Sequence, residues 1–164
     1  MSHLVVVMGV SGAGKSTVGG LIAEGLGVGF RDADDFHPPA NIAKMSSGAP
    51  LTDADRWPWL DAIGAHLRAH RATGCVVTCS ALKRAYRDRL RAAAPGLRFV
   101  HLHGDMALVA ARQAARQGHF MPASLVANQF ATLEAPQDEP DVIALDVAAT
   151  PAALAAAAIR ALDG

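Results

Sequence analysis

The residues with the clearest chemical meaning form a glycine-rich loop near the start of the chain. The segment GVSGAGKST, residues 9–17, matches G-x-x-x-x-G-K-[ST] and lies between an apolar run and an amphipathic stretch. Glycines let such a loop turn tightly, so that its N–H groups can cradle a phosphate chain. We expect Lys15 to reach the β- and γ-phosphates of ATP and the Ser16 hydroxyl to ligate Mg²⁺. The predicted nucleotide-binding residues here are Gly9, Ser11, Gly12, Ala13, Gly14, Lys15, Ser16 and Thr17.

A glycine-rich turn that merely joins a strand to a helix is the alternative interpretation. Such a turn does not require lysine and serine at these two places, which favours nucleotide binding. Binding does not reveal what the nucleotide is used for, so the acceptor must be sought elsewhere in the chain.

Carboxylates gather after the second predicted strand, where a phosphate acceptor could be held. A kinase that phosphorylates a hydroxyl needs a carboxylate that positions the acceptor and can take its proton. Asp32, Asp34 and Asp35 are candidates at the carboxyl end of a strand, the edge where open α/β sheets bind ligands. Any one of them could instead cap a helix.

Two cations and a serine are candidates for the acceptor side. Arg56, expected just before a helix that tolerates Pro58 in its first turn, could grip a carboxylate, or pair with Asp53 or Asp55 at the surface. Ser80 and Lys83 follow the CVVTC run and should emerge beside the glycine-rich loop. They could equally be an N-cap serine and an exposed helical lysine.

Other aromatic and basic residues in these segments are expected to be structural. Trp57 and Trp59 favour packing over a role as sugar platforms. Four arginines lie around one predicted helix rather than along one stripe, which favours a solvated face: Arg84, Arg87, Arg89 and Arg91.

A small mobile lid is predicted at about residues 112–123. Arg112 and Arg116 are four apart on a predicted helix and so project from one face towards the segment QGHFMP. A kinase must exclude water from its site, and a closing segment with cations would do so over the phosphates. An ordinary surface helix and loop is the alternative.

The elements that must position these residues alternate between strand and helix. Apolar, β-branched runs predict strands at 4–8, 75–79, 98–103 and 142–147, with a weaker one at 28–31. Helical spacing follows each strand, at about 18–26, 60–67, 82–93, 106–117, 123–133 and from Thr150 onward. This α/β pattern predicts a parallel sheet with helices on both faces.

Composition bounds the protein class. The 164 residues suit one domain, 1–164, and Lys plus Arg equals Asp plus Glu at 15 each, which argues against a nucleic-acid partner. The apolar run at 4–8 is too short for a signal peptide or a membrane span, so we expect no membrane association and a cytoplasmic location. Cys75 and Cys79 suit buried strand thiols better than a disulfide framework or a two-by-two zinc site.

Several segments together resemble the gluconate kinase family of P-loop kinases, relatives of shikimate and nucleoside monophosphate kinases. They are MGVSGAGKST, DADDFHPPANIAKMSSGAPLTDADRWPWL, CSALKRAYRDRLR, LHGD, RQAARQGHFMP and LVANQFATLEAP, which cover most of residues 5–136 in the family's order. The resemblance implies a five-stranded parallel sheet, MgATP as phosphoryl donor, D-gluconate as acceptor, 6-phospho-D-gluconate as product, and a homodimer.

The resemblance also implies residue roles. Asp34 would hold the acceptor hydroxyl and serve as base, and Asp32 would support the hydrated Mg²⁺. Catalysis would rest on Lys15, Asp34 and Arg116, with Arg112 on the nucleotide side. The acceptor side would comprise Asp34, His37, Arg56, Ser80 and Lys83, together with His119 from the lid. Gln129 and Glu134 belong to the matching NQFATLEAP block without an evident chemical role.

Two alternative functions remain open from the sequence. One is a P-loop kinase for another small hydroxylated acceptor such as shikimate, although a shikimate kinase relative would carry a glycine run where CSAL stands. The other is a module that binds ATP and switches conformation without transferring phosphate.

Overall fold

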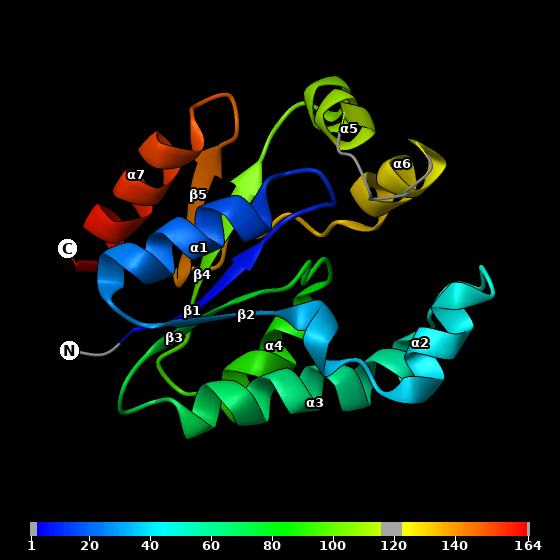
Figure 1. Cartoon of the computed structure of the whole chain (residues 1–164), viewed down its shortest axis with the longest axis horizontal. Coiled ribbons are helices and arrows are strands. Elements are labelled where there is room, and N and C mark those ends of the chain that lie inside the picture. Colours follow the sequence, from blue (N-terminus) through cyan, green and yellow to red (C-terminus); the bar gives the residue numbers. More distant parts are fainter. Residues whose placement is uncertain (1–2, 116–122, 164) are drawn as a thin grey trace.

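The computed structural model describes residues 3–115 and 123–163, with side chains described outside residues 113–126. A five-stranded sheet with the order β2-β3-β1-β4-β5 forms its centre, and every strand pairing is parallel (Figure 1). The strands are β1 (Leu4–Met8), β2 (Gly29–Asp32), β3 (Cys75–Thr78), β4 (Arg98–His103) and β5 (Val142–Asp146). All five predicted strands are therefore confirmed, including the weak second one.

Helices connect the strands and pack on both faces of the sheet, as the α/β pattern predicts. They are α1 (Lys15–Leu26), the short 3₁₀ helix η1 (Ala33–Phe36), α2 (Pro39–Ser46), α3 (Asp53–Ala69), α4 (Arg84–Ala93), α5 (Met106–Ala115), α6 (Ala123–Thr132) and α7 (Pro151–Asp163). The sequence did not predict η1 or α2. In the described part of the chain, no helix is both long and apolar enough to cross a membrane.

Two hydrophobic layers sandwich the sheet. Alternate residues of β1 point to opposite faces, so Val5 and Val7 pack with α1 and α7, whereas Val6 and Met8 pack with α3 and α4. Figure 1 shows these two helix pairs on opposite sides of the strands, with α2, α5 and α6 beyond the strand ends. Both cysteines are buried and form no disulfide, as expected for strand thiols.

The start of α3 differs from the prediction. Thr52 caps the helix, because its hydroxyl accepts from Asp55 N while the Asp55 carboxylate accepts from Thr52 N, forming a capping box. The helix therefore begins at Asp53, and Arg56 lies in its first turn instead of before it. Pro58 is inside the helix, beyond the first turn.

The expectation of a solvated arginine face on α4 is wrong for Arg87. Its guanidinium is completely buried and binds both Glu139 carboxylate oxygens, from Nε at 2.9 Å and from Nη2 at 2.7 Å. Nη1 donates to Ala81 O at 2.6 Å. Arg91 binds Glu139 and Asp141 from the same helix, so this face of α4 lies under the segment that leads into β5.

We expect Glu139→Gln to lower the free energy of unfolding by about 3–5 kcal/mol at pH 7, because it leaves the buried Arg87 charge without its partner. Burial opposes ionisation of Glu139, but hydrogen bonds from Arg87 and Arg91 hold its pKa at about 2. A depressed carboxyl pKa stabilises the fold above its unfolded value and ceases to do so as pH falls towards 2. The difference between wild type and variant in denaturant titrations should therefore shrink between about pH 5 and pH 2.

The exposed Arg89–Asp61 pair, at 2.7 Å, supplies the matched control. Asp61→Asn should change the unfolding free energy by less than about 1 kcal/mol, because surface ion pairs contribute little. Equal losses of unfolding free energy in Glu139→Gln and Asp61→Asn would contradict the conclusion that burial makes the Arg87–Glu139 pair important for stability.

Candidate active site

The glycine-rich loop follows β1, which lies between β3 and β4 in the centre of the sheet. This is the point where the chain's strand order reverses, and ligands of open α/β sheets bind there. Gly9 has φ +149°, and a Cβ atom on it would lie 2.7 Å from Leu102 O. Gly14 caps α1 in the left-handed region at φ +92°. Both positions therefore need glycine for the loop to close against the sheet.

Two side chains of the loop, those of Lys15 and Ser16, carry reactive groups. Lys15 Nζ donates to Gly9 O and Val10 O, each at 3.0 Å, which holds the ammonium group over the loop. Ser16 is exposed at the start of α1. The N–H groups and the positive end of this helix favour an anion, so the arrangement suits a phosphate chain.

Asp32 joins the loop to the carboxylate segment. One carboxylate oxygen, Oδ2, accepts from Ser16 Oγ at 3.1 Å, and the other, Oδ1, accepts from Asp34 N at 2.9 Å. The capping alternative is thus correct for Asp32, but it does not exclude a metal role. A hydroxyl and a carboxylate side by side form the hard oxygen donor set that Mg²⁺ prefers.

Asp34 of η1 lies beside the stacked rings of His37 and Trp59. The His37 side chain, 6 % exposed, places Nε2 at 3.8 Å from Asp34 Oδ1. Its ring lies parallel to that of Trp59, with centroids 4.4 Å apart, and Trp59 Nε1 donates to Ala33 O at 2.7 Å. Trp59 therefore packs rather than serving as a sugar platform, and it fixes the turn that presents Asp34.

The pKa values of Asp34 and His37 are shifted in opposite directions. Partial desolvation, aided by the negative charge of Asp32, raises the pKa of Asp34 above its ordinary value. Desolvation lowers the pKa of His37, so its ring is neutral at neutral pH. Asp34 points outward with its side chain 86 % exposed, and a raised carboxyl pKa makes it a stronger proton acceptor than an ordinary aspartate.

The two cations predicted for the acceptor side lie together around Asp53 and Tyr86. Arg56 Nη1 is 3.5 Å from Asp53 Oδ1 and donates to Tyr86 OH at 3.2 Å. Lys83 Nζ lies 3.4 Å from the same Asp53 oxygen. The Tyr86 hydroxyl donates to Asp53, and this bond is the main reason that the pKa of Asp53 is lowered. The surface pairing considered for Arg56 exists, and it also brings Arg56 to Lys83.

Ser80 and Lys83 take positions that differ from the capping alternative. Ser80 lies between β3 and α4, half-buried, and its carbonyl accepts from Gly9 N at 3.3 Å. Lys83, not Ser80, is the N-cap residue of α4, and its side chain makes no cap bond. Instead the Glu134 carboxylate accepts from Arg84 N at 2.9 Å, which gives Glu134 a structural contact that the sequence did not reveal.

Ala81, next to Ser80, has φ +46°, which is uncommon for a residue with a side chain. The buried Arg87 guanidinium binds its carbonyl and so holds this turn in place. The Arg87–Glu139 pair thereby supports the turn that follows Ser80.

Helix α6, which follows the predicted lid in the chain, also contacts the glycine-rich loop. Ser11 N donates to Gln129 Oε1 at 2.5 Å, so α6 is bonded directly to a loop amide. Arg112 Nη1 donates to Val147 O at 2.6 Å, after β5. Arg116 and His119 lie outside the described residues, as does most of the predicted lid. No sequence signal could have identified the contact of Gln129.

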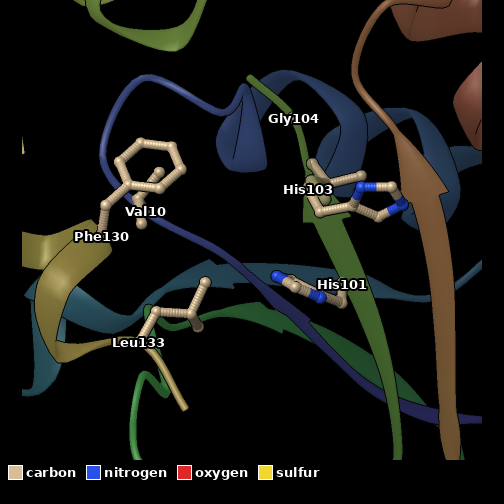
Figure 2. A pocket seen from close by; sticks show the side chains of 7 residues that line it. Val10, His101, His103, Gly104, Phe130 and Leu133 are labelled. Atoms are coloured by element: carbon tan, nitrogen blue, oxygen red, sulfur yellow. The ribbon is translucent and has the colours of Figure 1, made fainter. Parts of the chain in front are cut away.

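A small cavity of about 100 Å³ lies beside the loop. Figure 2 shows Val10 of the loop next to Phe130 and Leu133 of the α6 end, with the His101 ring directed towards this space from β4. Burial lowers the pKa of His101 to about 4, so its ring is neutral. The cavity is smaller than ordinary ligand pockets of about 300–1,000 Å³, so it cannot by itself hold a whole nucleotide.

Comparison with known proteins agrees with this geometry. Residues 4–140 match a family model described as an AAA domain. The gluconokinase of Gluconobacter oxydans is 51 % identical over 86 % of this chain and 80 % of that protein, and the thermoresistant gluconokinase of Escherichia coli is 46 % identical over 88 % and 85 %. A crystal structure of a gluconokinase from Sinorhizobium meliloti superposes with a TM-score of 0.90 at 53 % identity, covering 98 % of this chain and 91 % of the other. The chain belongs to the gluconokinase family of P-loop kinases.

Proposed function

We propose that this chain transfers the γ-phosphoryl group of ATP to the 6-hydroxyl of D-gluconate, giving 6-phospho-D-gluconate and ADP. The observation that carries the proposal is that donor and acceptor groups share one edge of the sheet. Ser16 of the phosphate loop and Asp32 of the acceptor segment are 3.1 Å apart, and Asp34 follows in the same turn. Phosphoryl transfer depends mainly on such positioning and on charge stabilisation.

On the donor side, the loop amides and Lys15 bind the phosphates of ATP. Ser16 and Asp32 would hold Mg²⁺, which neutralises charge on the phosphate oxygens during transfer. Arg112, on α5, would lie on the nucleotide side. Arg116 from the lid would stabilise charge on the transferred group.

On the acceptor side, Asp34 would orient the 6-hydroxyl and accept its proton as the oxygen attacks. His37 would hold the Asp34 carboxylate, and Ser80 would bind an acceptor hydroxyl. Arg56 and Lys83 would bind the gluconate carboxylate, which must share these cations with Asp53 or displace it. His119 would close over the acceptor from the lid. From the family resemblance, we propose that the chain forms a homodimer. Sedimentation equilibrium tests this proposal.

A coupled assay of ADP production tests the proposed acceptor. Gluconate should support turnover, whereas shikimate and nucleoside monophosphates should react orders of magnitude more slowly, because a site that bonds one set of hydroxyls rejects analogues lacking them by about 10⁴-fold. Faster turnover with another compound would show that this compound, and not gluconate, is the preferred acceptor. Tight ATP binding without transfer to any acceptor would instead support the switch module.

Arg56→Ala should raise the KM for gluconate by about 10- to 100-fold, since a charge-assisted bond contributes about 1.5–3 kcal/mol. The same change should narrow the preference for gluconate over its neutral analogue glucitol. Arg89→Ala is the matched control, because each arginine pairs with an aspartate and lies over an aromatic ring. Arg56 lies 5.5 Å from the centre of the Tyr86 ring, and Arg89 lies 5.0 Å from that of the Trp57 ring. An unchanged gluconate KM in a folded Arg56→Ala protein would remove Arg56 from the acceptor site.

A further inference from the structure

Three side chains with metal-ligand chemistry meet at the edge of the sheet opposite to the phosphate loop. Among the residues that the structure describes, His66, His70 and Cys75 form a group whose ligand atoms all lie within 4.8 Å of one another. Cys75 begins β3 and pairs with Leu4 and Gly29, at the amino ends of β1 and β2. The group therefore lies at the far end of the strands from the proposed reaction.

The chain between α3 and β3 brings these residues together by a tight turn. His66 and His70 are four apart at the end of α3 and so share one helix face. His70 O accepts from Gly74 N at 2.7 Å and from Thr73 N at 3.2 Å, which returns the chain at once towards the sheet. The thiol of Cys75 thus arrives beside the two imidazole rings, whose centroids are 4.2 Å apart.

The hydrogen bond of His70 leaves its other nitrogen available as a ligand. His70 Nδ1 lies 2.8 Å from His66 O, and a carbonyl oxygen can only accept, so Nδ1 carries the proton. The lone pair is then on Nε2. A ring N–H that donates to a backbone carbonyl is the usual support of a metal-binding histidine.

We propose that His66, His70 and Cys75 form a zinc-binding site with a fourth position open to solvent. Two imidazoles and one thiolate are borderline-soft ligands that zinc prefers, and two histidines four apart on a helix are a recurrent way to hold it. Zinc bonds of about 2.0–2.3 Å place tetrahedral ligand atoms about 3.3–3.8 Å apart. Ligand atoms that now lie within 4.8 Å of one another therefore need to approach by at most about 1–1.5 Å to close the site.

Zinc binding would join the end of α3 to the start of β3. The zinc–sulfur bond forms as the Cys75 thiol loses its proton to solvent, and both histidines bind as neutral rings. Cys75 is buried while the histidines are half-buried, which leaves an entry from the histidine side. Because Cys75 begins β3, whereas Asp34 and Lys15 follow the carboxyl ends of β2 and β1, occupancy should raise thermal stability with little change in the rate of phosphoryl transfer.

Cobalt(II) titration of the full, nucleotide-free chain tests the site, because a cobalt–thiolate bond gives a charge-transfer band in the near ultraviolet. One equivalent of cobalt should produce this band together with the visible absorption of a tetrahedral ion, and zinc should displace both. The second buried cysteine supplies the matched control. Cys79→Ser should keep the band, whereas Cys75→Ser should lose it.

His70→Asn keeps a donor for His66 O but removes the ligand, so it tests the site even where Cys75→Ser fails to fold. It should weaken zinc affinity by about 10-fold or more and abolish most of the zinc-induced rise in Tm. Absence of the band in folded wild type, or an equally strong band in Cys75→Ser, would overturn the proposal. Unchanged zinc affinity in His70→Asn would do the same.

Discussion

Asp34→Asn is expected to lower kcat with gluconate by about 10²- to 10⁴-fold, the usual loss when a positioned general base is removed. Asparagine keeps the size and a carbonyl oxygen, so the loss reflects the missing proton acceptor. Steady-state kinetics should show little change in the KM for ATP. In wild type, kcat/KM should fall as pH drops through the raised pKa of Asp34, since the base must be ionised to act.

Asp35→Asn is the matched control for that variant. Asp35 lies one residue further along η1, and its carboxylate accepts from Arg31 Nε at 3.5 Å instead of facing His37. Its substitution should leave kcat within about twofold, because surface ion pairs of this kind contribute little. A comparable loss in both variants would show that Asp34 is not specially placed.

Lys15→Ala should reduce kcat by at least about 10²- to 10³-fold, because a preorganised charge at the phosphates is removed. Lys15 is already held over the loop by Gly9 O and Val10 O, so little reorganisation is needed when phosphate arrives. Single-turnover measurements with saturating ATP would separate this chemical defect from weaker nucleotide binding.

Arg160→Ala, at an exposed position of α7, controls for the loss of one positive charge. It should leave kcat unchanged. Full activity in a folded Lys15→Ala protein would contradict the role of the loop in phosphoryl transfer. Weaker ATP binding with a normal kcat would show that Lys15 binds ATP but does not assist the transfer.

The strands and the phosphate loop could be predicted from sequence because their signals are local. Runs such as residues 4–8 are apolar throughout, as buried parallel strands require, and residues 9–17 combine glycines with lysine and serine. The position of Asp32 after a strand was sufficient to predict that it would reach the same edge as Ser16.

Helix boundaries in the acceptor segment were harder, because polar side chains there serve capping and binding together. Thr52 and Asp55 form a capping box, so α3 begins before Arg56 and not after it. Pro38 and Pro39 begin α2 in a stretch without an apolar stripe, so periodicity could not reveal it.

Contacts between distant segments could not be predicted from one sequence. Arg87 was expected at the surface because the arginines of α4 lie around the helix rather than along one stripe. Its partner Glu139 is 52 residues away, and only their pairing makes burial of the charge tolerable. The bonds from Ser11 N to Gln129 and from Tyr86 to Asp53 also depend on tertiary packing. The bond to Gln129, and that from Arg84 N to Glu134, give structural contacts to the two residues of the NQFATLEAP block that had no evident chemical role.

Nuclear magnetic resonance of the reaction products tests the central claim most directly. With ATP, Mg²⁺ and uniformly ¹³C-labelled gluconate, the chain should form one ADP for each new phosphate ester, and phosphorus coupling should appear at C6 of the sugar acid. Release of inorganic phosphate without an ester, or an ester at another carbon, would contradict the proposed transfer to the 6-hydroxyl.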